Sequence, residues 1–361
     1  MDISKVLKVW YQKHHRQLPW RKINDPYKIW LSEIILQQTR VEQGLPYFNR
    51  FVSDYPTVRH LADAPEQDIM KLWQGLGYYS RARNLHAAAK MIVADYQGVF
   101  PKSFENIKSL KGIGDYTAAA IASFAYNLPH AVVDGNVYRV LARLFAIPTP
   151  IDSSEGKKDF AILAQKLLDK KDPAIHNQAI MELGALVCKP IRPDCENCPL
   201  ILKCAAYNIG EVNRFPVKAN RIKVTNRYFN YLMIRHKGNF YLNHRNGNDI
   251  WRNLFDLPMI ETEKATTPEL LVKTSGWRAL FGHQLVHIEK VKIFKVHKLS
   301  HQHLHTTFYN VSMTSTTNLN RNKFYAIYPT RDSKRHFAHH THLQRCNFKY
   351  NSNLRYRNKN R

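Results

Sequence analysis

The chain has 361 residues, enough for two ordinary domains and too many for one small core. Hydrophobic residues make up 44% of it, which allows a substantial core and excludes a wholly disordered chain. Lysine and arginine outnumber aspartate and glutamate by 54 to 28, a formal net charge of +26 at pH 7. Nucleic acid is the commonest polyanionic partner of so basic a protein, although charge alone does not establish DNA binding.

The first ten residues lack the apolar run of a signal peptide, and no apolar stretch is long enough to span a membrane. We therefore expect a soluble protein of the bacterial cytoplasm, with no membrane partner.

Residues 1 to about 210 read as helices separated by short turns, so this half is predicted to be all-α. Asp25 and Pro26 predict a helix start, because aspartate caps free amides and proline tolerates the first helical position. Apolar residues at helical spacing continue this helix through Gln38. Further helices are predicted near 66–73, 80–95, 117–126, 136–145, 157–169 and 173–188.

Glu33 lies within this otherwise apolar first helix, in WLSEIILQQTR. Burial would raise the pKa of its carboxyl group and keep it protonated as a general acid. The alternative is a partly exposed helical glutamate without a catalytic role.

Residues 103–126 predict a helical hairpin in which Lys-Gly-Ile-Gly turns the chain. Gly112 and Gly114 let the backbone turn tightly and approach a ligand closely. The amino end of the following helix offers free amides to an anion such as phosphate. A plain helical hairpin remains the alternative.

Asp134 precedes a helix in VVDGN, where it is predicted either to cap that helix or to act as a second functional carboxylate. Two carboxyl groups in different environments can divide proton donation from stabilisation of a developing positive charge, as they do in glycoside hydrolysis.

Four cysteines, Cys188, Cys195, Cys198 and Cys204, are spaced C-x6-C-x2-C-x5-C. Four thiols this close in sequence predict a metal centre. Structural zinc is one reading, although zinc ligands usually form two tight pairs and only the central pair is tight here.

The sequence changes character after Cys204. Residues 211–225 are polar and basic and predict a linker, and β-like runs follow in 227–235, 239–245 and 306–313. A second, α+β or mostly β domain is therefore predicted over 226–330. Residues 331–361 are basic and poor in aliphatic residues, which predicts a disordered tail containing a bystander, Cys346.

Taken together, SEIILQQTRV, GLGYYSRARNL, LKGIGDYTAAA, VVDGNVYRVLAR and the cysteine loop resemble the adenine DNA glycosylases of the endonuclease III superfamily. The resemblance covers residues 5–210 and implies a helix-hairpin-helix glycosylase domain. It implies that Glu33 protonates adenine at N7 and later activates water, while Asp134 stabilises the cationic sugar or a transient covalent adduct. Asn136 and Tyr116 would help to position these groups, with Arg21 nearby.

The same resemblance implies the contacts with DNA. Gln178 is a lesser candidate for reading the flipped adenine. Gln38 and Tyr78, with Leu76 beside them, would fill the vacated base stack, and Gln38 and Thr39 would contact the opposing lesion. The alternative places Tyr78 and Tyr79 in the core.

Tyr116 occupies the position of a lysine in endonuclease III-type enzymes, which resemble this hairpin. That lysine forms the Schiff base that cuts the DNA strand. Since tyrosine forms none, hydrolysis without efficient strand cleavage is expected unless another lysine substitutes.

The cysteine spacing resembles the 4Fe-4S loop of this superfamily. The resemblance implies a cluster that folds a basic loop, with Lys189, Arg192 and Lys203, against DNA and takes no part in the chemistry.

Residues 226–330 resemble, more faintly, the Nudix-like domain of adenine glycosylases that recognises 8-oxoguanine. NDIWRNLFDLPMIE is similar to a W-x-G-L-W-x-F-P stretch, with Asn253 and Phe255 replacing glycine and tryptophan. Leu299-Ser300-His301 falls where many members have Phe-Ser-His, with leucine in place of phenylalanine, and Ser300 and His301 become candidates for lesion recognition. Alternatively, HQHLH simply alternates along a strand. No glutamate-rich Nudix box is present, so this domain is predicted to recognise and not to hydrolyse.

The sequence therefore predicts a monomeric base excision repair enzyme that removes adenine opposite 8-oxoguanine or guanine in double-stranded DNA. Two alternatives stay open. One is a bifunctional endonuclease III-like lyase, and the other is a non-catalytic iron–sulfur DNA-binding protein.

Overall fold

A computed structural model describes residues 2–219, 224–236, 239–245, 247, 252, 254–282, 286–299, 301–313 and 324–327. The chain divides into two compact units. One contains Met1–Ala64 and Arg81–Arg221, and the other contains Pro65–Ser80 and Ile222–Arg361. The predicted boundaries at 210 and 225 stay predictions. Within the described residues, no helix is both long and apolar enough to cross a membrane.

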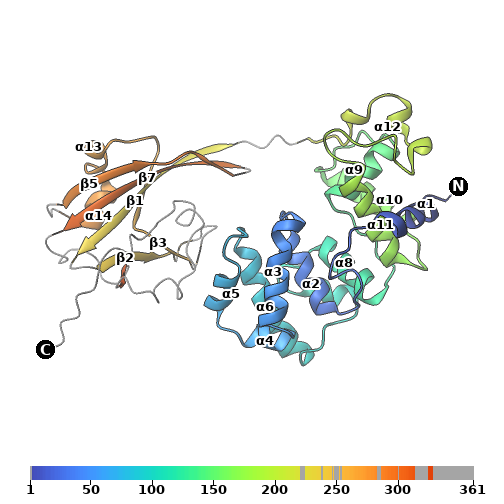
Figure 1. Ribbon diagram of the computed structural model, residues 1–361, viewed down its shortest axis with the longest axis horizontal. Coiled ribbons are helices and arrows are strands. Elements are labelled where there is room, and N and C mark those ends of the chain that lie inside the picture. The colour runs from blue at the N-terminus through green and yellow to red at the C-terminus, as the bar shows by residue number, and fades with distance from the viewer. Residues whose placement is uncertain are drawn as a thin grey trace. The chain divides into compact units, whose positions relative to one another are not determined.

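The first unit is built from helices, as the sequence predicts (Figure 1). Its helices of ten or more residues are α1 (Ile3–His14), α2 (Pro26–Leu36), α3 (Val41–Asp54), α6 (Ser80–Tyr96), α8 (Asp115–Tyr126), α9 (Gly135–Leu144), α10 (Ser154–Leu167) and α11 (Pro173–Leu186). Its shorter helices are α4 (Val58–Asp63), α7 (Phe104–Ser109), α12 (Ala205–Asn208), and the 3-10 turns η1 (Ile201–Lys203) and η2 (Val212–Arg214). Helix α5 (Glu66–Leu72) lies in the Pro65–Ser80 segment.

The predicted start of α2 is confirmed. The Asp25 side chain accepts hydrogen bonds from the amides of Tyr27 and Lys28, and Pro26 is the first helical residue. The helix ends at Leu36, two residues before the predicted end, and Gln38 has a positive φ of 53°.

Helices α1, α9, α10 and α11 share one core, which sets the position of the carboxyl groups described below. Leu7, Leu141, Phe160 and Leu183 are among its buried members. Because α1 and α9 both pack on α11, the chain's first residues lie beside residues more than 160 positions away.

The second unit carries an eight-stranded sheet among its described residues, which confirms the predicted change from helices to strands. The strands are β1 (Thr225–His236), β2 (Asn239–His244), β3 (Phe255–Asp256), β4 (Met259–Thr262), β5 (Val286–Ile293), β6 (His297–Lys298), β7 (Gln302–Met313) and β8 (Phe324–Ile327). The main order is β3-β2-β1-β7-β5, and β1 and β7 are parallel.

Strand alternation gives this sheet two different faces. Leu232 and Tyr309 share one face and pack in a core with Trp277 and Phe281 of α14 (Ser275–Phe281), next to α13 (Pro268–Leu271). On the other face Tyr231 stacks on Phe308 with ring centroids 4.9 Å apart. The predicted tail, 331–361, and Cys346 lie outside the described residues.

Candidate functional site

Glu33 occupies the third turn of α2 and is buried, with 8% of the residue exposed. The hydroxyl group of Tyr116, on α8, donates a hydrogen bond of 2.7 Å to its Oε2 atom. The pKa of the Glu33 carboxyl group is raised to about 7, chiefly by burial and to a lesser extent by the charge of Asp134, while Tyr116 and Arg21 act in the opposite direction. The structure thus brings Glu33 and Tyr116 together and leaves Glu33 able to hold a proton near neutral pH.

Asp134 caps α9, so the capping alternative describes its geometry correctly. Its Oδ1 atom accepts hydrogen bonds from the amides of Asn136 (2.9 Å) and Val137 (2.8 Å), and Oδ2 accepts one of 2.7 Å from Nδ2 of Asn136. Burial is the strongest influence on Asp134 and leaves its pKa above the usual value, although these donors act in the opposite direction. Each of the three donors stabilises the charged form of the carboxyl group, so capping and a functional charge are compatible.

Arg21 is one of two arginines that bind the buried carboxylate of Glu182, on α11. Its NH1 and NH2 atoms donate hydrogen bonds of 2.9 and 2.6 Å to Oε1 and Oε2. Gln178, one turn earlier on α11, accepts a 2.5 Å hydrogen bond from the Tyr11 hydroxyl group. Sequence reasoning placed Arg21 and Gln178 near the site but missed Glu182 and Tyr11, whose only signal is an acidic residue within the apolar run IMELGAL.

Arg139 is another residue that the sequence analysis missed. Its NH2 group donates hydrogen bonds to Oδ1 of Asn136 (2.9 Å) and to the carbonyl of Gly184 (2.8 Å), and its Nε atom donates to the carbonyl of Cys188 (2.6 Å). A β-carbon on Gly184 would lie 2.6 Å from that of Asn136, so α11 needs glycine there to approach the start of α9 closely.

The residues predicted to fill the DNA stack differ in exposure. Tyr78 is 47% exposed with a positive φ of 49°, whereas Tyr79 is 1% exposed and belongs to the core. Leu76 is buried. The core alternative therefore fits Tyr79 and not Tyr78.

Gln38 and Thr39 follow the end of α2, where Arg81 fixes the backbone. The Arg81 NH1 group donates to the carbonyls of Ile34 (2.9 Å) and Gln37 (2.6 Å). Such capping satisfies carbonyls at a helix end and holds the following turn in place.

The helical hairpin forms as predicted, from α7 through the turn to α8. Gly112 has a positive φ of 77°, and a β-carbon there would lie 2.6 Å from Cβ of Asn84. Gly114 is extended and has open space beside it, so the turn itself does not require glycine there, and its close approach to a ligand stays a prediction. No side chain caps α8 at Gly114, and its first amide N–H groups can donate hydrogen bonds to an anion.

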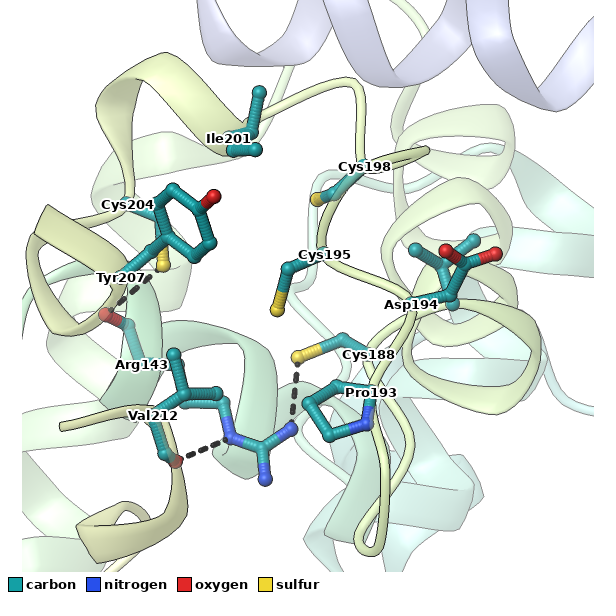
Figure 2. Close-up of a pocket in the computed structure, with 11 residues that line it drawn as sticks. Arg143, Cys188, Pro193, Asp194, Cys195, Cys198, Ile201, Cys204, Tyr207 and Val212 are labelled. Atoms are coloured by element: carbon teal, nitrogen blue, oxygen red, sulfur yellow. Dashed lines mark hydrogen bonds between the residues drawn. The ribbon is translucent and has the colours of Figure 1, made fainter. Parts of the chain in front are cut away.

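The four cysteines line one pocket together with Arg143 (Figure 2). An Arg143 NH1 group lies 3.3 Å from Sγ of Cys188, and the Cys204 thiol lies 3.5 Å from the Arg143 carbonyl oxygen. Within the part of the chain that the structure describes, no three histidine, cysteine or acidic side chains are grouped as ligands of a single metal ion.

His301 is exposed between β6 and β7, directly before β7 begins. Ser300 lies outside the described residues. His303 and His305 lie within β7, and His305 stacks on Tyr228 with ring centroids 4.5 Å apart. The alternating-strand reading of HQHLH therefore fits His303 and His305, whereas His301 precedes the strand.

Comparisons with known proteins bear on both units. Residues 31–166 match the HhH-GPD superfamily of base excision DNA repair proteins, and residues 230–341 match the NUDIX domain. An adenine DNA glycosylase of Buchnera aphidicola subsp. Schizaphis graminum is 33% identical over 325 residues, covering 89% of this chain and 90% of that protein. The human adenine DNA glycosylase is 42% identical over 206 residues, covering 55% and 38%.

A solved thermostable thymine-DNA glycosylase superimposes with a TM-score of 0.54 at 28% identity, covering 57% of this chain and 95% of that one. The shared region thus corresponds to a helical domain of glycosylase type.

Proposed function

The chain belongs to the adenine DNA glycosylase family, and from this premise we propose that it flips adenine out of double-stranded DNA and hydrolyses its N-glycosidic bond opposite 8-oxoguanine or guanine. It is a DNA N-glycosylase by family. The observation that carries the reaction chemistry is the buried Glu33 carboxyl group, which can hold a proton near neutral pH. The Tyr116 hydroxyl group donates a hydrogen bond to it, and the charge of Asp134 favours its protonated form.

In the proposed reaction Glu33 donates its proton to a ring nitrogen of adenine, so the base leaves as a neutral molecule. Bond breaking puts positive charge on the sugar, and the hydrogen-bonded Asp134 carboxylate stabilises that charge. Having lost its proton, Glu33 becomes the base that activates water. Tyr116 and Asn136 hold the two carboxyl groups in these positions.

Tyr116 supports an essentially monofunctional enzyme. Its hydroxyl group donates to Glu33. By sequence resemblance, Tyr116 stands where endonuclease III-type enzymes carry a lysine. Without an amine at this position no Schiff base forms with the sugar, and the strand stays intact after base removal.

The cysteine pocket supports a 4Fe-4S cluster held by Cys188, Cys195, Cys198 and Cys204. All four thiols line this one pocket, so they can bind a single centre, and their spacing resembles that of the superfamily's 4Fe-4S loop. Bound there, a cluster would supply folding energy to residues 188–204 and no step of the reaction.

We assign catalysis to residues 1–210, a linker to 211–225 and recognition of the lesion to 226–330. The match to the NUDIX domain supports this assignment, and Ser300 and His301 are its candidate contacts. Flipping would be assisted by Gln38 and the exposed Tyr78, and the Gly112–Gly114 turn would bind a backbone phosphate.

The test is single-turnover cleavage of a labelled duplex carrying adenine opposite 8-oxoguanine, with and without hot alkali. Breaks only after alkali would support adenine removal without lyase action. Breaks without alkali would show a lyase. Intact strands in both lanes, with DNA bound, would favour a non-catalytic binding protein.

A further inference from the structure

Glu182 fastens the N-terminal segment to α11 from a position that is almost fully buried. Its side chain is 1% exposed and accepts five hydrogen bonds, all from Arg16 and Arg21. Arg21 also donates to the Arg16 carbonyl at 2.9 Å, and its guanidinium group lies 5.6 Å from the ring centroid of Tyr11. Arg21 is therefore fixed in position, and its positive charge is paired with the Glu182 carboxylate.

The positive charge of Arg21 lowers the pKa of the Glu33 carboxyl group. Besides burial, three groups shift this pKa: Tyr116 on α8, which donates a hydrogen bond, Asp134 at the start of α9, and Arg21 from the segment before α2. Two of them favour loss of the Glu33 proton, namely the Tyr116 hydroxyl donor and the Arg21 cation, while Asp134 opposes it. An unpaired arginine in this position would favour the carboxylate form much more strongly.

We propose that Glu182 is a positioning residue of the active site, which holds and neutralises Arg21 so that Glu33 keeps the proton that it delivers to the base. The proposal rests on the proposed function, because it presupposes Glu33 as the general acid. Glu182 itself need touch neither substrate nor reacting atoms.

The charge of Glu182 makes the proposal distinct from simple packing. Hydrogen bonds from Arg21 and Arg16 outweigh burial and lower the pKa of Glu182 to about 2, so it stays anionic wherever Glu33 titrates. A neutral isostere keeps the volume but leaves the Arg21 charge uncompensated. The expected effect is therefore a displaced pH profile in addition to any loss of rate.

The experiment is the pH dependence of single-turnover adenine excision for the wild type and for Glu182→Gln. The rate should fall as the pH rises through the pKa of Glu33, and this alkaline limb should move to lower pH by about one unit in the variant. Glu155→Gln is the matched control, since Glu155 is an exposed carboxylate in the first turn of α10, and its limb should not move.

Three further variants separate charge from structure. Glu182→Asp retains the anion, so its limb should stay at the wild-type pH even where its rate is lower. Arg21→Gln should move the limb to higher pH, and adding it to Glu182→Gln should restore at least the wild-type position. The Arg21 variants keep the proposal testable if Glu182→Gln does not fold.

A rate that falls equally at all pH values in a folded Glu182→Gln protein, with an unmoved limb, would overturn the proposal. So would an unmoved limb in Arg21→Gln. Failure of the proposed function gives a different result. In that case the wild type itself would excise no adenine, or Glu33→Gln would excise it as fast as the wild type.

Discussion

Glu33 and Glu182 are the same residue type, each buried in a helix of the same unit, yet their surroundings drive them in opposite directions. Glu33 receives a hydrogen bond from the neutral Tyr116 hydroxyl group, and burial raises its pKa to about 7. Glu182 receives five hydrogen bonds from two arginines, which lower its pKa to about 2.

The comparison shows that burial alone does not decide which carboxyl group becomes an acid. Desolvation is the largest influence in both cases, and it always disfavours the charged form. The partner decides the outcome, because a fixed cation restores the charge and a neutral donor does so only in part. Glu33 is thereby suited to give up a proton, and Glu182 to hold a positive group in place.

The largest expected effect is on catalysis. Glu33→Gln removes the proposed acid while preserving shape, so adenine excision should fall by about 10³-fold or more. Duplex binding should persist, because phosphate contacts do not involve Glu33. Single-turnover rates and gel-shift titrations measure the two quantities. Loss of binding along with activity would count against the assigned role.

The Glu182 side of the comparison predicts acid sensitivity. Because folding lowers its pKa from 4.5 to about 2, Glu182 stabilises the fold above pH 4.5 and loses that contribution as the pH falls toward 2. The contribution is on the order of 3 kcal/mol. Denaturant unfolding of Glu182→Gln should show a deficit at pH 7 that narrows at pH 3. A deficit independent of pH would contradict this reading.

The Glu33 side predicts the opposite sign. Because folding raises its pKa from 4.5 to about 7, the protonated Glu33 contributes fully to stability below pH 4.5. That contribution is lost as the pH rises through about 7 and the buried carboxyl group becomes charged. Glu33→Gln should therefore be more stable than the wild type at pH 8, by up to about 3 kcal/mol, with little difference at pH 4. Equal stability of the two proteins at pH 8 would show that Glu33 is not held in an environment that disfavours its charge.

The smallest expected effect concerns Tyr116, whose hydrogen bond lowers the pKa of Glu33. Tyr116→Phe removes that donor, so the pKa should rise and the alkaline limb of excision should move to higher pH, by less than about one unit. The pH profile of single-turnover excision measures it. A limb moving to lower pH would contradict the direction of the Tyr116 contribution.

Much of the architecture could be predicted because its signals are local. The Asp25–Pro26 helix start, the Gly112 turn and the shift to strands after residue 224 depend on neighbouring residues, and each is confirmed. The family match confirms the fold class.

The difference between the two glutamates could not be predicted from local sequence. Each lies within an apolar helical run, which made Glu33 a candidate acid, and the family context then distinguished it from Glu182. The donors that distinguish Glu182, on Arg16 and Arg21, lie 166 and 161 positions away. Their arrival depends on the packing of α1 against α11, which periodicity does not encode.

The most direct test of the central claim is an isotope-edited carboxyl titration of the intact protein, assigned with Glu33→Gln and Glu182→Gln. We predict that the Glu33 signal titrates near pH 7 and that the Glu182 signal stays ionised to below pH 3. If both signals titrated between pH 4 and 5, the two environments would be equivalent, and Glu33 would not be the protonated acid on which the proposed reaction depends.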